Sequence, residues 1–129
     1  MTKRIIVIDD EEAIRKSFEL ALEDSGYKVD TASSGKEGLE TLQGDPYDLV
    51  FLDLKMPGLT GVETLRELRK RDKKIPVYIV TAFYGEFFDE LKPMAEGGIE
   101  FEVLNKPVDS DTILQLCQAV LEGTMFVGD

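Results

Sequence analysis

Short runs of apolar, largely β-branched residues recur along the chain. The strongest cover residues 5–8, 49–52 and 77–80, and weaker versions cover 29–32 and 101–104. β-Branched side chains favour extended backbone, so the five runs predict five strands. Because the strongest runs are apolar at every position, we expect those strands to be buried on both faces of a sheet.

The segments between these runs have apolar residues three and four positions apart, which predicts amphipathic helices. Segments with this spacing are 14–22, 39–42, 62–68 and 113–121. A further helix is expected over 86–96. Pro93 lies inside it, so this helix should be short or irregular.

Strand and helix alternate five times, which predicts an α/β fold. Each connection between parallel strands must cross over and cover the sheet, so we expect a five-stranded parallel sheet with helices on both faces, a (βα)5 arrangement. A length of 129 residues suits one domain. We assign residues 1–123 to that domain and 124–129 to a short C-terminal tail.

Polar side chains follow four of the five predicted strands. Asp9 and Asp10 follow the first, Asp53 follows the third, Thr81 ends the fourth and Lys106 follows the fifth. In open parallel sheets, ligands bind beyond the carboxyl ends of the strands, where the strand order reverses. This distribution predicts the flavodoxin-like order 2-1-3-4-5, with the first and third strands flanking the site.

Three carboxylates at one crevice repel one another unless a cation compensates them. Oxygen ligands suit Mg²⁺, which keeps several waters and accepts a phosphate oxygen as a further ligand. Lys106 could hold an anionic oxygen, and the Thr81 hydroxyl could donate a hydrogen bond to it. Since a carboxylate can attack phosphorus, Asp53 is the candidate acceptor of a phosphoryl group.

Composition removes several classes of function. Twenty-six Asp and Glu against 15 Lys and Arg give a net charge of −11, which disfavours direct nucleic-acid binding. The sequence has no His, so the chain itself can be neither a histidine kinase nor a phosphohistidine relay, and His-based triads and zinc sites are excluded. The single Cys117 allows no internal disulfide, and the first residues predict neither a signal peptide nor a membrane span. We therefore expect a cytoplasmic protein without membrane partners.

Four motifs, taken in order, resemble the receiver domains of two-component response regulators over nearly the whole chain. They are Val7-Ile8-Asp9-Asp10-Glu11, Leu52-Asp53-Leu54-Lys55-Met56-Pro57-Gly58, Thr81-Ala82 and Lys106-Pro107. The resemblance implies a signalling domain rather than an enzyme. Its phosphoryl donor would be a sensor histidine kinase or a phosphotransfer protein, and its output partner would use a surface around the fourth helix and fifth strand.

The resemblance also assigns roles to single residues. Asp53 would be phosphorylated, and the Lys106–Pro107 peptide bond would be cis. The Mg²⁺ ligands would be Asp9, Asp10, Asp53 and the backbone carbonyl of Lys55, and the phosphoryl-binding and switch residues would be Thr81, Ala82 and Lys106.

One feature departs from the family. Receivers usually have an aromatic residue three positions before the lysine, where this chain has Val103. We hypothesise that Phe101, two residues earlier and on the same face of a regular strand, or a bulge nearby, takes over as the aromatic switch. Lys55 and Phe83 stand at positions that resemble those tuning dephosphorylation in the family.

Three other interpretations remain open. A Mg²⁺-dependent phosphohydrolase would also form an aspartyl phosphate, but it would want an acid two residues after the nucleophile, where Lys55 stands. A flavodoxin-like cofactor binder would want glycines or hydroxyls after the first strand. A receiver-shaped interaction module that is never phosphorylated would not need the complete set of polar residues.

Overall fold

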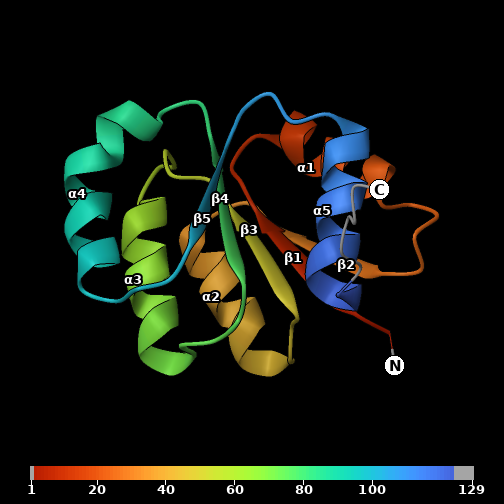
Figure 1. Ribbon diagram of the computed structural model, residues 1–129, viewed down its shortest axis with the longest axis horizontal. Helices are drawn as coiled ribbons and strands as arrows, with labels where there is room; N and C mark the ends of the chain where they lie inside the picture. Colours follow the sequence, from red (N-terminus) through yellow and green to blue (C-terminus); the bar gives the residue numbers. More distant parts are fainter. Residues whose placement is uncertain (1, 124–129) are drawn as a thin grey trace.

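A computed structural model describes residues 2–123, and Figure 1 shows a single twisted sheet at its centre. The five strands are parallel and lie in the order β2-β1-β3-β4-β5, as the sequence predicts. The strands are β1 (Arg4–Ile8), β2 (Lys28–Ala32), β3 (Leu49–Leu52), β4 (Val77–Thr81) and β5 (Glu102–Asn105). The predicted tail, 124–129, lies outside the described residues, so the domain boundary stays a prediction.

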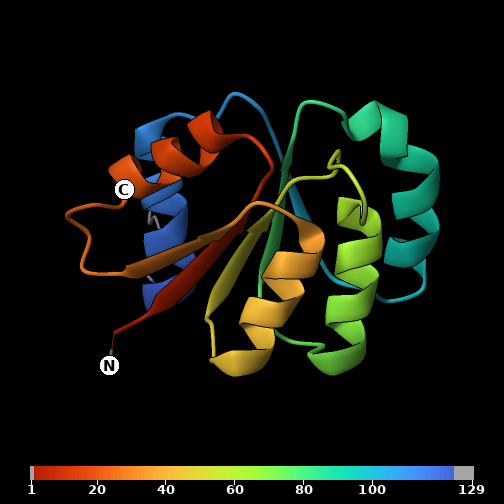
Figure 2. The same cartoon turned by 180° about the vertical axis from the view of Figure 1, so that it is seen from behind.

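Five helices cover the two faces of the sheet. Figures 1 and 2 show α1 and α5 on one face and α2, α3 and α4 on the other. The helices are α1 (Glu12–Ala21), α2 (Gly35–Gly44), α3 (Gly61–Arg71), α4 (Tyr84–Glu96) and α5 (Ser110–Glu122). Within 2–123, no helix has the length and apolar content needed to cross a membrane.

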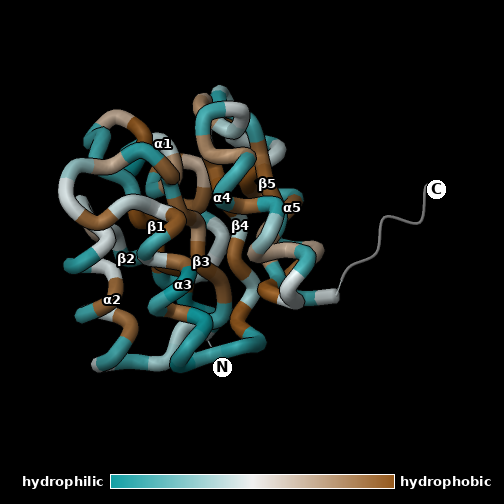
Figure 3. The backbone as a smooth tube through the Cα atoms, turned by 90° about the vertical axis from the view of Figure 1, so that its left-hand side faces the viewer, coloured by the Kyte–Doolittle hydropathy of each residue, from teal (hydrophilic) through white to brown (hydrophobic). Residues whose placement is uncertain are grey.

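The apolar strands divide the core into two halves. In β1, Ile5 and Val7 belong to the cluster beneath α1 and α5, whereas Ile6 and Ile8 belong to the cluster beneath α2, α3 and α4. Successive side chains of a strand point to opposite faces, so a strand covered on both faces must be apolar throughout. The hydrophobic colouring of the central strands in Figure 3 follows from this double burial.

Two expectations about single elements are corrected by the structure. Helix α4 is not short: it has 13 residues and continues through Pro93. Proline removes one backbone hydrogen bond, but Leu91 and Met94 on either side are buried in the core and hold the helix in place. Strand β5 begins at Glu102 rather than at Phe101.

Candidate functional site

Backbone pairing brings the ends of four strands to one edge of the sheet. Ile8 pairs with Leu52, so Asp9 and Asp53 leave neighbouring strands side by side. The Asp53 N–H donates to the Ile8 carbonyl at 2.9 Å, and the Lys106 N–H donates to the Thr81 carbonyl at 2.9 Å. The predicted polar residues are therefore fixed by sheet hydrogen bonds at the point where strand order reverses.

The Lys106 ammonium lies among three carboxylates. Its Nζ is 2.9 Å from Asp9 Oδ2, 3.2 Å from Glu11 Oε1 and 3.6 Å from Asp53 Oδ1. Only 11% of the Lys106 side chain is exposed. Burial alone would lower the pKa of Lys106, but the hydrogen bond to Asp9 and the charges of Asp9 and Asp53 outweigh it and raise the pKa. Lys106 is therefore held as a cation.

The Asp53 carboxylate is buried and incompletely satisfied. The residue is 3% exposed, and within the described chain its Oδ1 has no hydrogen-bond partner. Burial, reinforced by the charge of Asp9 and opposed by Lys106, raises the pKa of Asp53 to about 6. Burial also raises the pKa of Asp9, against the effect of its hydrogen bond with Lys106. The site thus concentrates negative charge that a single lysine does not neutralise.

A divalent cation would fit this surplus of carboxylates. One oxygen from each of Asp9, Asp10, Glu11 and Asp53 lies within 4.8 Å of the others. Among residues 2–123, no group donates a hydrogen bond to Asp53 Oδ1, and such a free carboxylate oxygen is the ligand that a hard cation such as Mg²⁺ needs. Glu11, directly after the acidic pair, also reaches the site, although no role follows for it from the sequence.

Thr81 is fully buried at the end of β4, and its hydroxyl oxygen accepts a hydrogen bond from the Phe83 N–H at 2.9 Å. Ala82 follows at the surface. Across the rim of the site, the exposed Lys55 side chain contacts the start of α4: its Nζ is 3.5 Å from Glu86 Oε2 and 4.4 Å from the centre of the Phe83 ring. The loop after β3 is therefore linked to the loop after β4.

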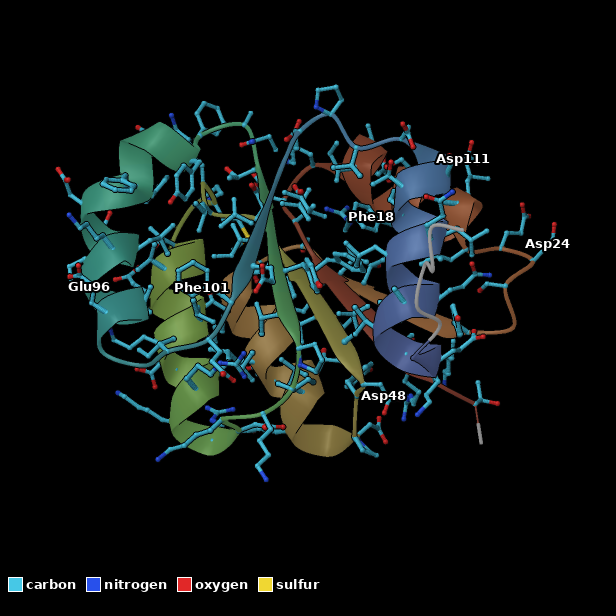
Figure 4. All side chains as sticks on the ribbon, in the orientation of Figure 1. Phe18, Asp24, Asp48, Glu96, Phe101 and Asp111 are labelled. Atoms are coloured by element: carbon cyan, nitrogen blue, oxygen red, sulfur yellow. The ribbon has the colours of Figure 1, made fainter. Side chains whose placement is uncertain are left out.

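The two residues considered for the aromatic switch both pack against the core beneath α3 and α4, consistent with one shared face. Val103 pairs with Ile79 inside β5. Phe101, labelled in Figure 4, lies one residue before β5. Because Thr81 pairs with Asn105, Phe101 lies about four residues, or roughly 13 Å, along the strand from Thr81.

The one-to-one pairing of β4 with β5 from Glu102 to Asn105 leaves no bulge within that strand. The role of Phe101 as an aromatic switch stays a prediction, and this distance weighs against it. The expected cis peptide bond between Lys106 and Pro107 is present.

Gly61, at the start of α3, is a site-supporting residue that the sequence analysis missed. Its N–H donates to the Leu54 carbonyl at 2.8 Å. A Cβ atom at this position would overlap with the Asp53 carbonyl oxygen and lie 2.6 Å from Leu54 Cα. Only glycine therefore lets α3 begin directly against the backbone that carries Asp53. A lone glycine before a helix gives no signal of such an approach.

Comparison with known proteins agrees with this geometry. The response regulator receiver domain family matches residues 5–118 of the chain. The chain belongs to the response regulator receiver family. Receiver domains are signalling domains rather than enzymes acting on external substrates, and they form part of two-component systems.

Solved structures share the fold of this receiver domain. A CheY-like receiver domain protein from Methanospirillum hungatei superposes with a TM-score of 0.84 at 27% identity, covering 95% of this chain and 96% of the other. A receiver domain protein from Clostridium thermocellum gives a TM-score of 0.79 at 34% identity, covering 94% and 95% of the two chains.

Curated relatives of this receiver domain are longer. The alkaline phosphatase synthesis transcriptional regulatory protein PhoP of Bacillus subtilis is 35% identical over 121 residues, which are 94% of this chain and 49% of PhoP. The transcriptional regulatory protein GlrR of Escherichia coli is 36% identical over 118 residues, 92% of this chain and 26% of GlrR. The receiver thus spans half or less of these two relatives.

Proposed function

We propose that this receiver accepts a phosphoryl group on Asp53 from a phosphohistidine of a partner histidine kinase or phosphotransfer protein, in a Mg²⁺-dependent reaction. The observation that carries the proposal is the buried Asp53 carboxylate, whose unpartnered Oδ1 lies 3.6 Å from the Lys106 ammonium. A buried carboxylate oxygen without a hydrogen bond costs stability, and a function in which the carboxylate acts as a nucleophile accounts for that cost.

An electron pair on an Asp53 carboxylate oxygen forms a new bond to phosphorus, and the bond from phosphorus to the imidazole nitrogen of the donor breaks. The electron pair of the broken bond stays on that nitrogen. Lys106 holds an oxygen of the incoming phosphoryl group with its positive charge and so offsets the repulsion between two anions.

Mg²⁺ would be held by Asp9, Asp10, Asp53 and the Lys55 backbone carbonyl. When bound, it supplies positive charge that stabilises the phosphoryl oxygens during transfer. The surrounding residues keep Asp53 in place through the sheet hydrogen bond to Ile8 and exclude bulk water through burial of the strand ends.

Thr81 would transmit the effect of phosphorylation from the site to α4. Its hydroxyl oxygen is occupied by the Phe83 N–H, so a shift of Thr81 toward a phosphoryl oxygen must break or stretch that bond. Phe83 directly precedes α4. Phosphorylation would therefore favour a second arrangement of the surface around α4 and β5, where an output partner binds.

Several partners follow from the same proposal. The net charge of −11 favours contacts of this chain with proteins rather than with nucleic acid. The proteins that donate the phosphoryl group would be cytoplasmic histidine kinases. PhoP and GlrR are named as transcriptional regulatory proteins, and that role belongs to those longer proteins as a whole. A phosphohydrolase is disfavoured because Lys55, bound to Glu86 and Phe83, stands where a second acid is needed.

Incubation with Mg²⁺ and acetyl phosphate tests the proposal. We expect intact mass measurement to find one added phosphoryl group on the wild type and none on Asp53→Asn. Glu12→Gln, an exposed acid on α1, is the matched control and should react like the wild type. A wild type that gains no mass, or an Asp53→Asn variant that gains the same mass, would contradict the proposal.

A further inference from the structure

Glu11 directs its side chain to the site rather than to the helix that it precedes. It occupies the position before α1, where polar side chains usually accept a hydrogen bond from the helix backbone. Within the described residues, the Glu11 side chain makes no such bond. Its Oε1 instead accepts a hydrogen bond from Lys106 Nζ at 3.2 Å.

Lys106 divides its donors unequally among its neighbours. Hydrogen bonds run to Asp9 at 2.9 Å and to Glu11 at 3.2 Å. Asp53 Oδ1 is farther from Nζ, at 3.6 Å, and has no hydrogen bond in the described chain. The Lys106 ammonium therefore lies closer to Asp9 and Glu11, which precede α1, than to Asp53, and its contact with Asp53 is the weakest of the three.

We propose that Glu11 is a positioning residue that holds Lys106 away from Asp53 until a phosphoryl group arrives, and so slows phosphorylation. This inference rests on the proposed function of Asp53. The ammonium lies 3.2 Å from Glu11 Oε1 and 3.6 Å from Asp53 Oδ1, so a closer approach to a phosphoryl group on Asp53 moves it away from Glu11. Glu11 then returns to solvent at little cost, since 59% of its side chain is exposed.

Two other roles for Glu11 would give different results. As a Mg²⁺ ligand it would raise the affinity for the ion, because its carboxylate lies within 4.8 Å of the other three. As a simple negative charge it would repel an anionic donor without any contact to Lys106. Glu11→Asp separates contact from charge, because it keeps the carboxylate but shortens the side chain by one methylene group.

The first measurement is the rate of phosphorylation by acetyl phosphate at saturating Mg²⁺. An ion pair whose carboxylate is exposed, as that of Glu11 is, accounts for a change of roughly two- to fivefold. We expect Glu11→Gln and Glu11→Asp to react faster than the wild type by this factor, and the control Glu12→Gln to react at the wild-type rate. A wild-type rate for Glu11→Asp, or equal acceleration by Glu12→Gln, would overturn the inference in favour of simple charge repulsion.

The second measurement is Mg²⁺ affinity by calorimetry. We expect Glu11→Gln and Glu12→Gln to bind the ion within about a factor of two of each other. A tenfold or greater loss of affinity that is specific to Glu11→Gln would make Glu11 a metal ligand and would overturn the inference.

A third measurement needs neither phosphate nor metal. In the metal-free protein, the NMR signal of the Lys106 ammonium should shift in Glu11→Gln and Glu11→Asp but not in Glu12→Gln. An unshifted signal in both Glu11 variants would show that the contact does not exist in solution. A wild type that takes up no phosphoryl group would refute the proposed function, while this spectrum would still decide whether Glu11 holds Lys106.

Discussion

Asp53 is kept charged at neutral pH at the expense of stability. Its pKa of about 6 reflects burial first and the charge of Asp9 second, both of which favour the protonated form. In the unfolded chain the carboxyl has its ordinary value of 3.8. The folded protein therefore binds this proton more tightly than the unfolded chain does, and folding is favoured most when the proton is present.

Asp53→Asn should consequently stabilise the metal-free protein at neutral pH. The gain should be about 3 kcal/mol at pH 7.5, because the pKa of Asp53 is about 6 in the folded chain and 3.8 in the unfolded chain and a difference of one in pKa is worth about 1.4 kcal/mol. The gain should shrink as the pH falls through 6 toward 4. Urea denaturation at a series of pH values in the presence of a chelator measures it. The exposed, distant Asp24→Asn should give no such pH-dependent gain, and a gain for Asp53→Asn that is equal at all pH values would contradict the explanation.

The elements that sequence predicts best are those covered on both faces. Strands β1, β3 and β4 contain the whole of their predicted runs, and every position of those runs is apolar. In β5, Glu102 and Asn105 are exposed, so the apolar run that begins with Phe101 no longer coincides with the hydrogen-bonded strand. Local composition cannot reveal which residues of an edge strand are paired with a neighbour.

Helix α4 illustrates packing that overrides local preference. Pro93 is exposed, whereas Leu91 and Met94 are anchored in the core. Pro93→Ala should therefore restore a backbone donor without disturbing the core. We expect stabilisation of about 1–2 kcal/mol, because the cost of proline in a helix exceeds the gain that it brings by restricting the unfolded chain.

Thermal or urea denaturation measures this effect. The exposed Glu90→Ala on the same helix is the control and should change stability by less than about 0.5 kcal/mol. Destabilisation by Pro93→Ala would mean that the proline ring itself contributes to holding the helix.

At the scale of the whole molecule, the parallel arrangement of the strands made the site predictable. A parallel sheet places all carboxyl ends of its strands at one edge, so the sequence alone predicts that Asp9, Asp53, Thr81 and Lys106 lie close together. Contacts between side chains on separate loops could not. The Lys55–Glu86 ion pair depends on the path of two loops, and the sequence carries no pattern for either.

Mg²⁺ should stabilise the whole fold, because only the folded chain brings the carboxylates of Asp9, Asp10 and Asp53 together. At 100 times its dissociation constant, a bound ion adds about 2.7 kcal/mol, which should raise the melting temperature by several degrees. Scanning calorimetry with increasing MgCl₂ measures the shift, and NaCl at equal ionic strength is the control. Asp53→Asn should reduce the shift, and an identical shift in both proteins would place the ion elsewhere.

The ion pair between Asp9 and Lys106 joins residues separated by 97 positions in the chain. While the protein is being synthesised, the Asp53 carboxylate is made long before Lys106, which completes the site around it. A nascent chain that ends before β5 should therefore be inert toward phosphoryl donors, and competence should arise only once the last strand has docked. Phosphoryl uptake would then report complete folding, and a truncated regulator could not draw phosphate away from the signalling pathway.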